Sequence, residues 1–391
     1  MISQMLTVVA AAAALLAPLG APLYAQRSGE FITKAKNAIL IDAETGSVLF
    51  QQGADDLVPP ASLSKLMTLA VLFKALKDGK VKLEDELLTS ENAWRTGGAP
   101  SGTSAMFIPI NTRARIDELI QGIIVQSGND ACITVAEGLA GSVAKFSTQM
   151  EEEARRIGLK KSTFRNPTGL QDPEHLMTAR ELALLARYII KEYPEHYKVF
   201  AQKEFLYRKH KFYNRNPLLG SELGVDGLKT GHTAEAGYGI VVSAISNYRR
   251  VIGVVMGLAD EKERKEEARR LLEWGFRSFD QVKLFDADEV VGYARVWGGS
   301  EMYVSLTGKG PLAVILPRFP PNQKLRGEIV YQGPLKAPIK KGDEVAIFRV
   351  TTSSNASSEV PLYAAEDVGP GGFLRKGLDS LMYLALRKVG L

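Results

Sequence analysis

A serine and a lysine stand three residues apart in the segment 59–68, PPASLSKLMT. The two prolines disfavour helix before them, and the residues from Ala61 onward are good helix formers. A spacing of three places Ser62 and Lys65 on one helix face, where the amine can take the proton of the hydroxyl. The segment therefore predicts a serine nucleophile with a built-in general base.

The Ser-x-x-Lys spacing occurs a second time, at Ser142 and Lys145, so the spacing alone does not identify a site. We expect this second copy on a surface helix. For Ser62 and Lys65 the competing interpretation is a serine that caps a helix beside a solvated lysine. Motifs farther along the chain decide between these interpretations.

The second motif is Ser127-Gly128-Asn129. The apolar pattern predicts a helix over 116–126, a break at 127–130 and another helix over 131–139. The serine and the asparagine are therefore expected on a tight turn between two helices, where their side chains can face a cleft.

The third motif is Lys229-Thr230-Gly231, which is expected in a β-strand. Two β-rich runs at 237–243 and 250–256 follow it, and a turn at 246–248 joins them. We expect the motif strand to run antiparallel to its neighbours.

The surrounding pattern predicts the elements that position these motifs. A hairpin over 38–50 precedes the helix that carries Ser62, and a helix over 263–276 is expected to cover the sheet. At a helix N-terminus, Ser62 lies where the helix dipole stabilises negative charge. Beyond Phe279, short β-like runs separated by Gly and Pro predict a small all-β domain.

In this order the three motifs form the set that is typical of penicillin-binding proteins and serine β-lactamases. Over nearly its whole length, the chain resembles the low-molecular-mass penicillin-binding proteins that act as serine-type D-alanyl-D-alanine carboxypeptidases. Further segments that carry the resemblance are Asn166–Leu170 with Asp172 and His175, Asp226–Thr233, and Leu271–Phe276.

The resemblance implies an α/β (α+β) fold of the serine β-lactamase and transpeptidase type. In this fold, helices flank an antiparallel sheet, and there is an all-helical subdomain. A small all-β domain and a C-terminal amphipathic helix are expected to follow. The expected divisions are a signal peptide over 1–25, a catalytic domain over 27–279, an all-β domain over 282–368 and a membrane-anchor helix over 371–391.

The resemblance implies that Ser62 attacks the carbonyl between two D-alanines and forms an acyl-enzyme. For Lys65 to act as the base, the pKa of its amine must fall from about 10.4 to roughly 7 to 8. Burial and the neighbouring Lys229 cation would both lower it. Ser127 can relay the proton toward the leaving amine. This chemistry requires no cofactor.

The resemblance assigns further residues to substrate binding. These are Asn129, Lys229, Thr230, Gly231 and the backbone N–H of His232. The N–H groups of His232 and Ser62 would stabilise the oxyanion. Arg264 occupies the position of an arginine that orients the substrate carboxylate, and a solvated helix charge is the alternative interpretation.

The composition excludes several other functions. The net charge of +5 comes from 49 Lys and Arg residues mixed with 44 Asp and Glu residues, which argues against a nucleic-acid partner. The single cysteine, Cys132, excludes an internal disulfide and is expected to be a small core residue. The four histidines are scattered without a metal-ligand spacing, so no metal site is predicted.

Both ends of the chain predict a location outside the cytoplasm. Residues 1–25 carry no charged side chain and include an apolar run over 5–19, which indicates a secretory signal, with an uncleaved anchor as the alternative. Residues 371–391 place apolar side chains at helical spacing and basic ones largely off that stripe. We expect a periplasmic protein held peripherally at the inner membrane by this helix; docking of the helix on its own domain is the alternative.

The expected partners are peptidoglycan stems that end in D-Ala-D-Ala, with β-lactams as inhibitors that acylate Ser62. A β-lactamase, a DD-endopeptidase or a transpeptidase of the same fold, and a non-catalytic peptidoglycan-binding scaffold, are the alternatives. The β domain and the 166–175 segment favour a carboxypeptidase over a β-lactamase. Every motif side chain is present, which argues against a scaffold.

Overall fold

The computed structural model describes residues 4–6, 31–319, 324–353 and 357–373. The chain divides into two compact units, one formed by Glu30–Phe276 and the other by Met1–Gly29 with Arg277–Leu391. Apart from residues 4–6 and 371–373, the expected signal peptide and C-terminal helix lie outside the described residues.

The first unit is built on a five-stranded antiparallel sheet in the order β3-β2-β10-β9-β8. Its strands are β2 (Asn37–Asp42), β3 (Val48–Gln52), β8 (Val225–Thr233), β9 (Gly237–Ser246) and β10 (Arg249–Leu258). β-Branched residues fill the middle of β9 and β10 and are buried there, as expected for strands covered on both faces. The predicted hairpin and the antiparallel strand of the third motif are both confirmed.

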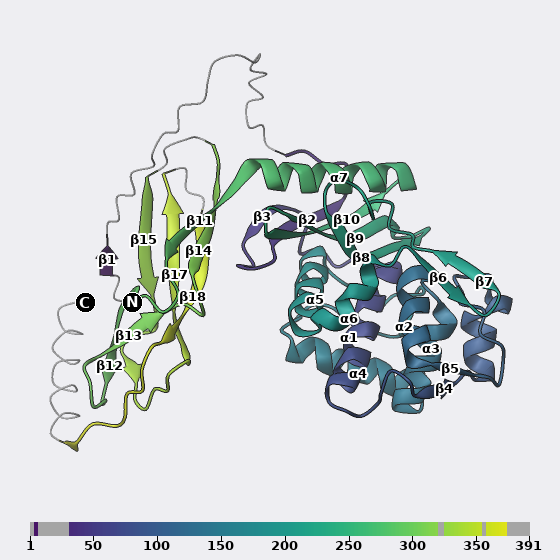
Figure 1. Cartoon of the computed structure of the whole chain (residues 1–391), viewed down its shortest axis with the longest axis horizontal. Helices are drawn as coiled ribbons and strands as arrows, with labels where there is room; N and C mark the ends of the chain where they lie inside the picture. The colour runs from purple at the N-terminus through teal and green to yellow at the C-terminus, as the bar shows by residue number, and fades with distance from the viewer. Residues whose placement is uncertain (1–3, 7–30, 320–323, 354–356, 374–391) are drawn as a thin grey trace, which may run out of the picture. The chain divides into compact units, whose positions relative to one another are not determined.

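Helices cover the two faces of this sheet (Figure 1). The helices are α1 (Lys65–Lys77), α2 (Ile116–Gln121), α3 (Asn129–Ala140), α4 (Val143–Arg156), α5 (Ala179–Glu192), α6 (Pro194–Tyr197) and α7 (Glu261–Ser278). Short 3₁₀ or π-helical turns are η1 (Ala61–Ser64), η2 (Ala93–Gly97), η3 (Ala99–Ser101), η4 (Gly122–Gln126) and η5 (Lys198–Ala201).

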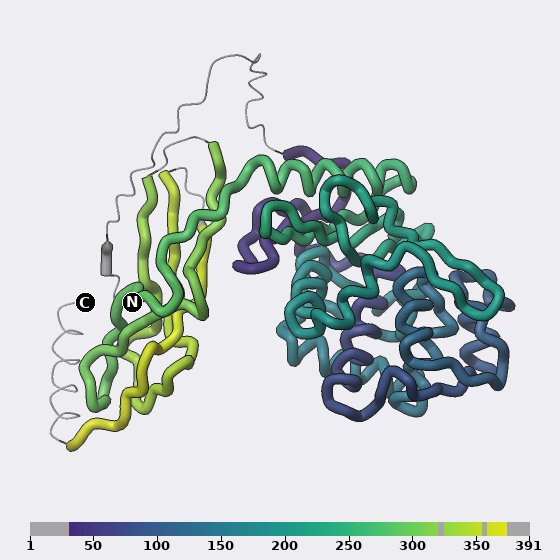
Figure 2. Tube along the Cα trace, viewed as in Figure 1, coloured from purple at the N-terminus to yellow at the C-terminus, as the bar shows by residue number. Residues whose placement is uncertain are grey.

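Helix α7 lies directly on the sheet, as predicted. A β-carbon built on Gly275 would lie 2.3 Å from a methyl carbon of Leu40, so a larger residue there would have to displace this buried side chain of β2. The tube in Figure 2 shows that segments far apart in the sequence lie together in this region: the early strands β2 and β3 lie beside the much later β10 and α7.

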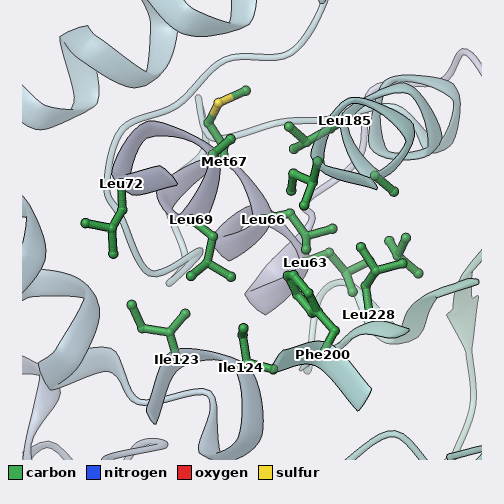
Figure 3. Packing of buried hydrophobic residues seen from close by; sticks show 14 of the residues in the cluster. Leu63, Leu66, Met67, Leu69, Leu72, Ile123, Ile124, Leu185, Phe200 and Leu228 are labelled. Atoms are coloured by element: carbon green, nitrogen blue, oxygen red, sulfur yellow. The ribbon is translucent and has the colours of Figure 1, made fainter. Parts of the chain in front are cut away.

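Helix α1 lies at the centre of the helical part. Ten of its residues, including Lys65, are buried, so α1 has no solvent-facing stripe over most of its length. Figure 3 shows Leu66, Leu69 and Leu72 of this helix among apolar side chains from several other elements. These neighbours include Ile123 and Ile124 of η4, Leu185 of α5, Phe200 of η5 and Leu228 of β8. The helix that begins at Lys65, three residues after the predicted nucleophile, is therefore fixed on several sides.

Two small two-stranded sheets of this unit were not expected. They pair β4 (Glu86–Leu88) with β5 (Arg113–Arg115), and β6 (Glu204–Tyr207) with β7 (His210–Tyr213). The predicted helix over 116–126 is confirmed in outline, but it changes from α-helix to π-helix at Gly122.

The second unit is all-β, as predicted. Its strands are β1 (Gln4–Leu6), β11 (Phe279–Phe285), β12 (Gly292–Trp297), β13 (Tyr303–Thr307), β14 (Leu312–Pro317), β15 (Leu325–Val330), β16 (Leu335–Lys336), β17 (Glu344–Thr352) and β18 (Ser357–Ala364). Seven form a sheet in the order β1-β15-β17-β18-β13-β12-β16, and β11 pairs with β14. Its core consists of residues from this unit only, among them Val304, Leu306 and Phe348.

Within the described residues, no helix has the length and apolar character needed to cross a bilayer. The same part of the chain contains no group of three or more His, Cys, Asp or Glu residues arranged to hold a metal ion.

Candidate functional site

The predicted nucleophile Ser62 lies in the short turn η1, which directly precedes α1. Ala61 begins η1 with a left-handed backbone (φ 49°), and Lys65 is the first residue of α1. Ser62 is partly exposed, whereas Lys65 is completely buried. The Lys65 Nζ lies 2.7 Å from Ser62 Oγ and donates to the Thr168 carbonyl at 2.6 Å. The predicted pair is therefore in hydrogen-bond contact, between a partly exposed serine and a buried lysine.

The electrostatic setting of Lys65 suits a base. Burial lowers the pKa of its amine from 10.5 to about 8, because the charged form loses its hydration. The nearby Arg215 cation lowers this pKa further, and Cys132 and Asp130 act in the opposite direction. A lysine with this pKa is substantially neutral in mildly alkaline solution and can accept a proton.

The second Ser-x-x-Lys copy has a different environment. Ser142 caps α4 by accepting a hydrogen bond from the backbone N–H of Lys145 at 3.3 Å, and the Lys145 side chain is exposed. The same spacing therefore produces a helix cap here and a buried amine at residue 65.

Ser127 and Gly128 form a turn before α3, as predicted, but the helix begins at Asn129, two residues earlier than expected. Ser127 has a left-handed backbone (φ 62°) and is almost fully buried, and its Oγ makes no hydrogen bond within the described residues. The Asn129 N–H donates to the Ser104 carbonyl at 2.7 Å, and its amide Nδ2 donates to Thr103 Oγ1 at 2.9 Å. Asn129 Oδ1 also lacks a protein partner in this part of the chain. Buried polar atoms of this kind are costly unless a ligand or water satisfies them.

The Lys-Thr-Gly motif lies on the edge strand β8. One edge of β8 is paired with β9, with Lys229 opposite Val241, and β8 is the last strand of the sheet. A β-carbon on Gly231 would lie 3.1 Å from the backbone nitrogen of Leu63, so β8 packs directly against η1 at this residue. The first and third motifs, far apart in the sequence, are therefore adjacent in space.

The Lys229 amine is buried and donates to the Thr230 carbonyl at 3.0 Å. Burial lowers its pKa well below the ordinary value, and the Lys65 and Arg215 cations lower it further. The two motif lysines therefore belong to one electrostatic system, in which a proton on one amine opposes a proton on the other.

His232 and Arg264 meet at the end of β8 through a shared aromatic ring. The His232 ring is exposed and stacks on Tyr238 with centroids 3.8 Å apart. The Arg264 guanidinium lies 5.6 Å from the same ring, and the arginine is only 5% exposed. Arg264 is therefore not a solvated helix charge, and its Nε has no hydrogen-bond partner within the described residues.

One charged residue of the site was not predicted. Arg215 donates from Nη1 to Ser104 Oγ at 2.7 Å, next to the loop that holds Asn129, and it lowers the pKa of both motif lysines. It follows the unexpected β6–β7 hairpin in a loop without a recognisable motif. Only the fold brings it to the site.

Cys132 is completely buried on α3, and burial raises the pKa of its thiol to about 12. This supports its interpretation as a core residue. Asp130, also on α3, is buried and accepts backbone N–H groups of Met106 and Ile108, at 2.8 and 3.1 Å. It thereby fixes the segment that follows Ser104 against the Ser-Gly-Asn turn.

Comparison with known proteins gives the same classification across the chain. Residues 25–260 match the family model described as D-alanyl-D-alanine carboxypeptidase, and residues 279–370 match the C-terminal domain of penicillin-binding protein 5. The D-alanyl-D-alanine carboxypeptidase DacC of Escherichia coli is 38% identical over 350 residues, which is 89% of this chain and 88% of the relative. DacA of Haemophilus influenzae is 36% identical over 353 residues, with 89% and 88% covered.

Solved structures agree with these sequence matches. Penicillin-binding protein 5 of Haemophilus influenzae superposes with a TM-score of 0.77 at 34% identity, over 87% of this chain and 99% of that one. Penicillin-binding protein D2 of Listeria monocytogenes, in its ampicillin-bound form, gives a TM-score of 0.58 at 29% identity, over 64% of this chain and all of its own. The predicted fold class is thus confirmed for the described residues, and the chain belongs to the D-alanyl-D-alanine carboxypeptidase family.

Proposed function

We propose that this protein is a serine-type D-alanyl-D-alanine carboxypeptidase that removes the terminal D-alanine from peptidoglycan pentapeptide stems. The observation that carries the proposal is the contact between a partly exposed hydroxyl at Ser62 and a completely buried amine at Lys65. The names of the relatives support the same activity.

In the acylation step the neutral Lys65 amine takes the proton of Ser62, and Oγ attacks the carbonyl carbon between the two D-alanines. The tetrahedral intermediate then collapses as the C–N bond breaks. Ser127 passes a proton to the leaving amine, because a hydroxyl can donate and accept at once. The products of this step are free D-alanine and an ester on Ser62.

The developing oxyanion is assigned to the backbone N–H groups of Ser62 and His232. Ser62 belongs to η1, and β8 packs against that turn at Gly231, the residue before His232, which supports this assignment. One such donor is typically worth about 3 kcal/mol in the transition state.

The substrate carboxylate is assigned to Lys229, Thr230 and Gly231 on β8, and the substrate amide to Asn129. Burial lowers the pKa of Lys229 because the charged amine loses its hydration. A bound substrate carboxylate would stabilise the charged amine and raise this pKa again. Arg215 and Arg264 add positive charge at the same end of the site. Asn129 Oδ1 lacks a protein partner within the described residues and is available to the substrate.

A water molecule then hydrolyses the ester, which releases the shortened peptide and returns a proton to Ser62. A β-lactam would acylate the same serine, and its opened ring would stay attached. The ampicillin-bound form of the Listeria relative supports this assignment.

The proposed location and organisation follow from the sequence. Residues 1–25 would direct export, residues 27–279 would form the catalytic domain, residues 282–368 the β domain, and residues 371–391 a helix that lies on the periplasmic face of the inner membrane. The uncharged apolar run at the start and the amphipathic pattern at the end support these proposals.

The test combines substrate turnover with mapping of the acylated residue. The wild-type protein should release D-alanine from a pentapeptide and carry a labelled penicillin on Ser62, as located by mass spectrometry. Ser62→Ala should lose both properties, whereas Ser142→Ala, in the second copy of the spacing, should keep both. A label on any residue other than Ser62, or D-alanine release by Ser62→Ala, would refute the assignment.

A further inference from the structure

The Lys65 amine has a second partner whose role the proposed reaction does not yet explain. A neutral amine has two N–H bonds and one lone pair, and only the lone pair can accept the Ser62 proton. Lys65 Nζ contacts Ser62 Oγ at 2.7 Å and the Thr168 carbonyl at 2.6 Å. A carbonyl only accepts hydrogen bonds, so the contact with Thr168 must use an N–H. This leaves the lone pair free to face the serine.

The Thr168 carbonyl is held by a turn that one side chain organises. Asn166 Oδ1 accepts from the Thr168 N–H at 3.1 Å, from Thr168 Oγ1 at 2.8 Å and from the Gly169 N–H at 2.8 Å. Its Nδ2 donates to the Leu170 carbonyl at 3.0 Å. A single amide therefore makes four hydrogen bonds within five residues and fixes the direction of the peptide group that contains the carbonyl.

The same turn contacts both α1, which carries Lys65, and η1, which carries Ser62. Thr68 of α1 donates from Oγ1 to the Pro167 carbonyl at 2.7 Å. Gly169 has a left-handed backbone (φ 75°), and a β-carbon on it would lie 1.9 Å from the Ala61 carbonyl oxygen. The turn is thus packed against α1 and η1 at once, so its position is coupled to both Lys65 and Ser62.

We propose that Asn166 is a positioning residue for the general base: it holds the Thr168 carbonyl so that this oxygen takes an N–H of Lys65 and directs the lone pair at Ser62. The proposal rests on the proposed function, since it assumes that Lys65 is the base. It makes Ser62, Lys65 and the Thr168 carbonyl a nucleophile, a base and an orienting group, and Asn166 sets the last of these.

Two substitutions test the hydrogen-bond role of Asn166. Asn166→Ala removes all three acceptor contacts and the donated one. Asn166→Asp keeps the acceptor atoms in place, loses the bond to Leu170 and adds a negative charge near Lys65, which raises the pKa of that amine. The other titratable or charged groups that act on Lys65 are Lys229 of β8, Arg215, Asp130 and Cys132 of α3, and His175. Both variants leave these groups unchanged.

The experiment measures the rate of acylation by a fluorescent penicillin from pH 6 to 10, and kcat and KM for a D-Ala-D-Ala peptide, on the full-length protein. For Asn166→Ala we expect the high-pH plateau of acylation to fall about 10- to 100-fold, part of what a general base contributes. Its kcat should fall while KM stays close to the wild-type value. Asn166→Asp should recover most of the plateau, with the rise in rate displaced to higher pH.

Asn37→Ala serves as the matched control. Asn37 is a buried amide of β2 that donates to the Gly53 carbonyl at 2.8 Å and to Asp56, and neither of these hydrogen bonds involves the turn around Thr168. This variant should be destabilised in thermal melting and keep the wild-type acylation profile.

Two results would overturn the inference: a wild-type plateau in Asn166→Ala, or an equal loss in the Ala and Asp variants. If Asn166→Ala does not fold, Asn166→Asp decides, because a recovered plateau supports positioning and a rate lost at every pH contradicts it. A wild-type protein that is never acylated at Ser62 would refute the proposed function instead, so the two failures are distinguishable.

Discussion

At the scale of single residues, the site is organised around a lysine that is costly to bury. Burial holds the pKa of Lys65 at about 8 in the folded protein, against 10.5 for the ordinary side chain. Below pH 8 the folded state must keep a charged amine out of water, and the two hydrogen bonds of Lys65 offset only part of this cost. Between pH 8 and 10.5 the folded state releases its proton before the unfolded state does, so stability rises with pH.

We therefore predict that Lys65→Met abolishes acylation and stabilises the protein. A difference of about 2.5 pKa units corresponds to at most about 3 kcal/mol, and the lost hydrogen bonds reduce this gain. Urea unfolding at pH 7 should show Lys65→Met to be more stable than the wild type by about 1 to 3 kcal/mol. The gap should narrow by pH 10. Lys145→Met, at an exposed lysine, should show no such pH-dependent difference, and a constant gap for Lys65→Met would contradict the argument.

Site residues could be predicted from the sequence where the residues that act together lie close together along the chain. Ser62 and Lys65 are recognisable because a helix fixes their relation within four residues, and the same holds for the Ser127 turn. Arg215 and Asn166 could not be assigned to the site in this way. Arg215 reaches Ser104 only through tertiary structure, and the role of Asn166 depends on a carbonyl that points at a lysine about a hundred residues earlier.

At the scale of elements, the critical contact is the one between β8 and η1. Gly231 makes this contact possible, because any β-carbon there would press within 3.0 Å of the Leu63 side chain and 3.1 Å of its backbone nitrogen. Leu63 directly follows the nucleophile. A shift of either element would move Ser62 away from the β8 backbone.

We predict that Gly231→Ala slows acylation by about 10- to 100-fold, because small misplacements of reacting groups have effects of this size. Gly253→Ala on β10 is the control, since its β-carbon would meet side-chain atoms at 3.3 Å or more. Stopped-flow acylation with a fluorescent penicillin measures both variants. Equal rates for wild type and Gly231→Ala would show that η1 can yield without loss.

The elements that the sequence revealed are those with long, regular patterns. The strands β8, β9 and β10 and the helix α7 have long apolar or amphipathic runs. The hairpin of β6 and β7 turns at Arg208 and Lys209, which are not typical turn residues, and Arg208 adopts φ 53°. Strand β18 contains Pro361, a residue that argues against a paired strand. These elements form because neighbouring strands and side chains stabilise them.

At the scale of the whole molecule, each unit has its own core. The buried apolar clusters of the first unit involve residues 31–272, and that of the second involves residues 291–368.

We predict that a protein ending after α7, at Ser278, folds and is acylated by penicillin at close to the full-length rate. Thermal melting and labelling of Ser62 check this expectation, with the full-length protein measured in parallel. A truncated protein that melts cooperatively but is not acylated would show that the β domain is required for catalysis. One that does not fold would contradict the independence of the two cores.

The orienting partner of Lys65 is a main-chain oxygen, and this limits how the protein can adapt. No substitution removes a peptide carbonyl. Mutations selected by an antibiotic can therefore alter the contact between Lys65 and the Thr168 carbonyl only by displacing the turn that carries this carbonyl. Gly169, the next residue, has a left-handed backbone and packs against the Ala61 carbonyl, which leaves little room for such a displacement. Inherited resistance in this enzyme should therefore arise at side chains around the site, while the turn that carries the Thr168 carbonyl stays unchanged.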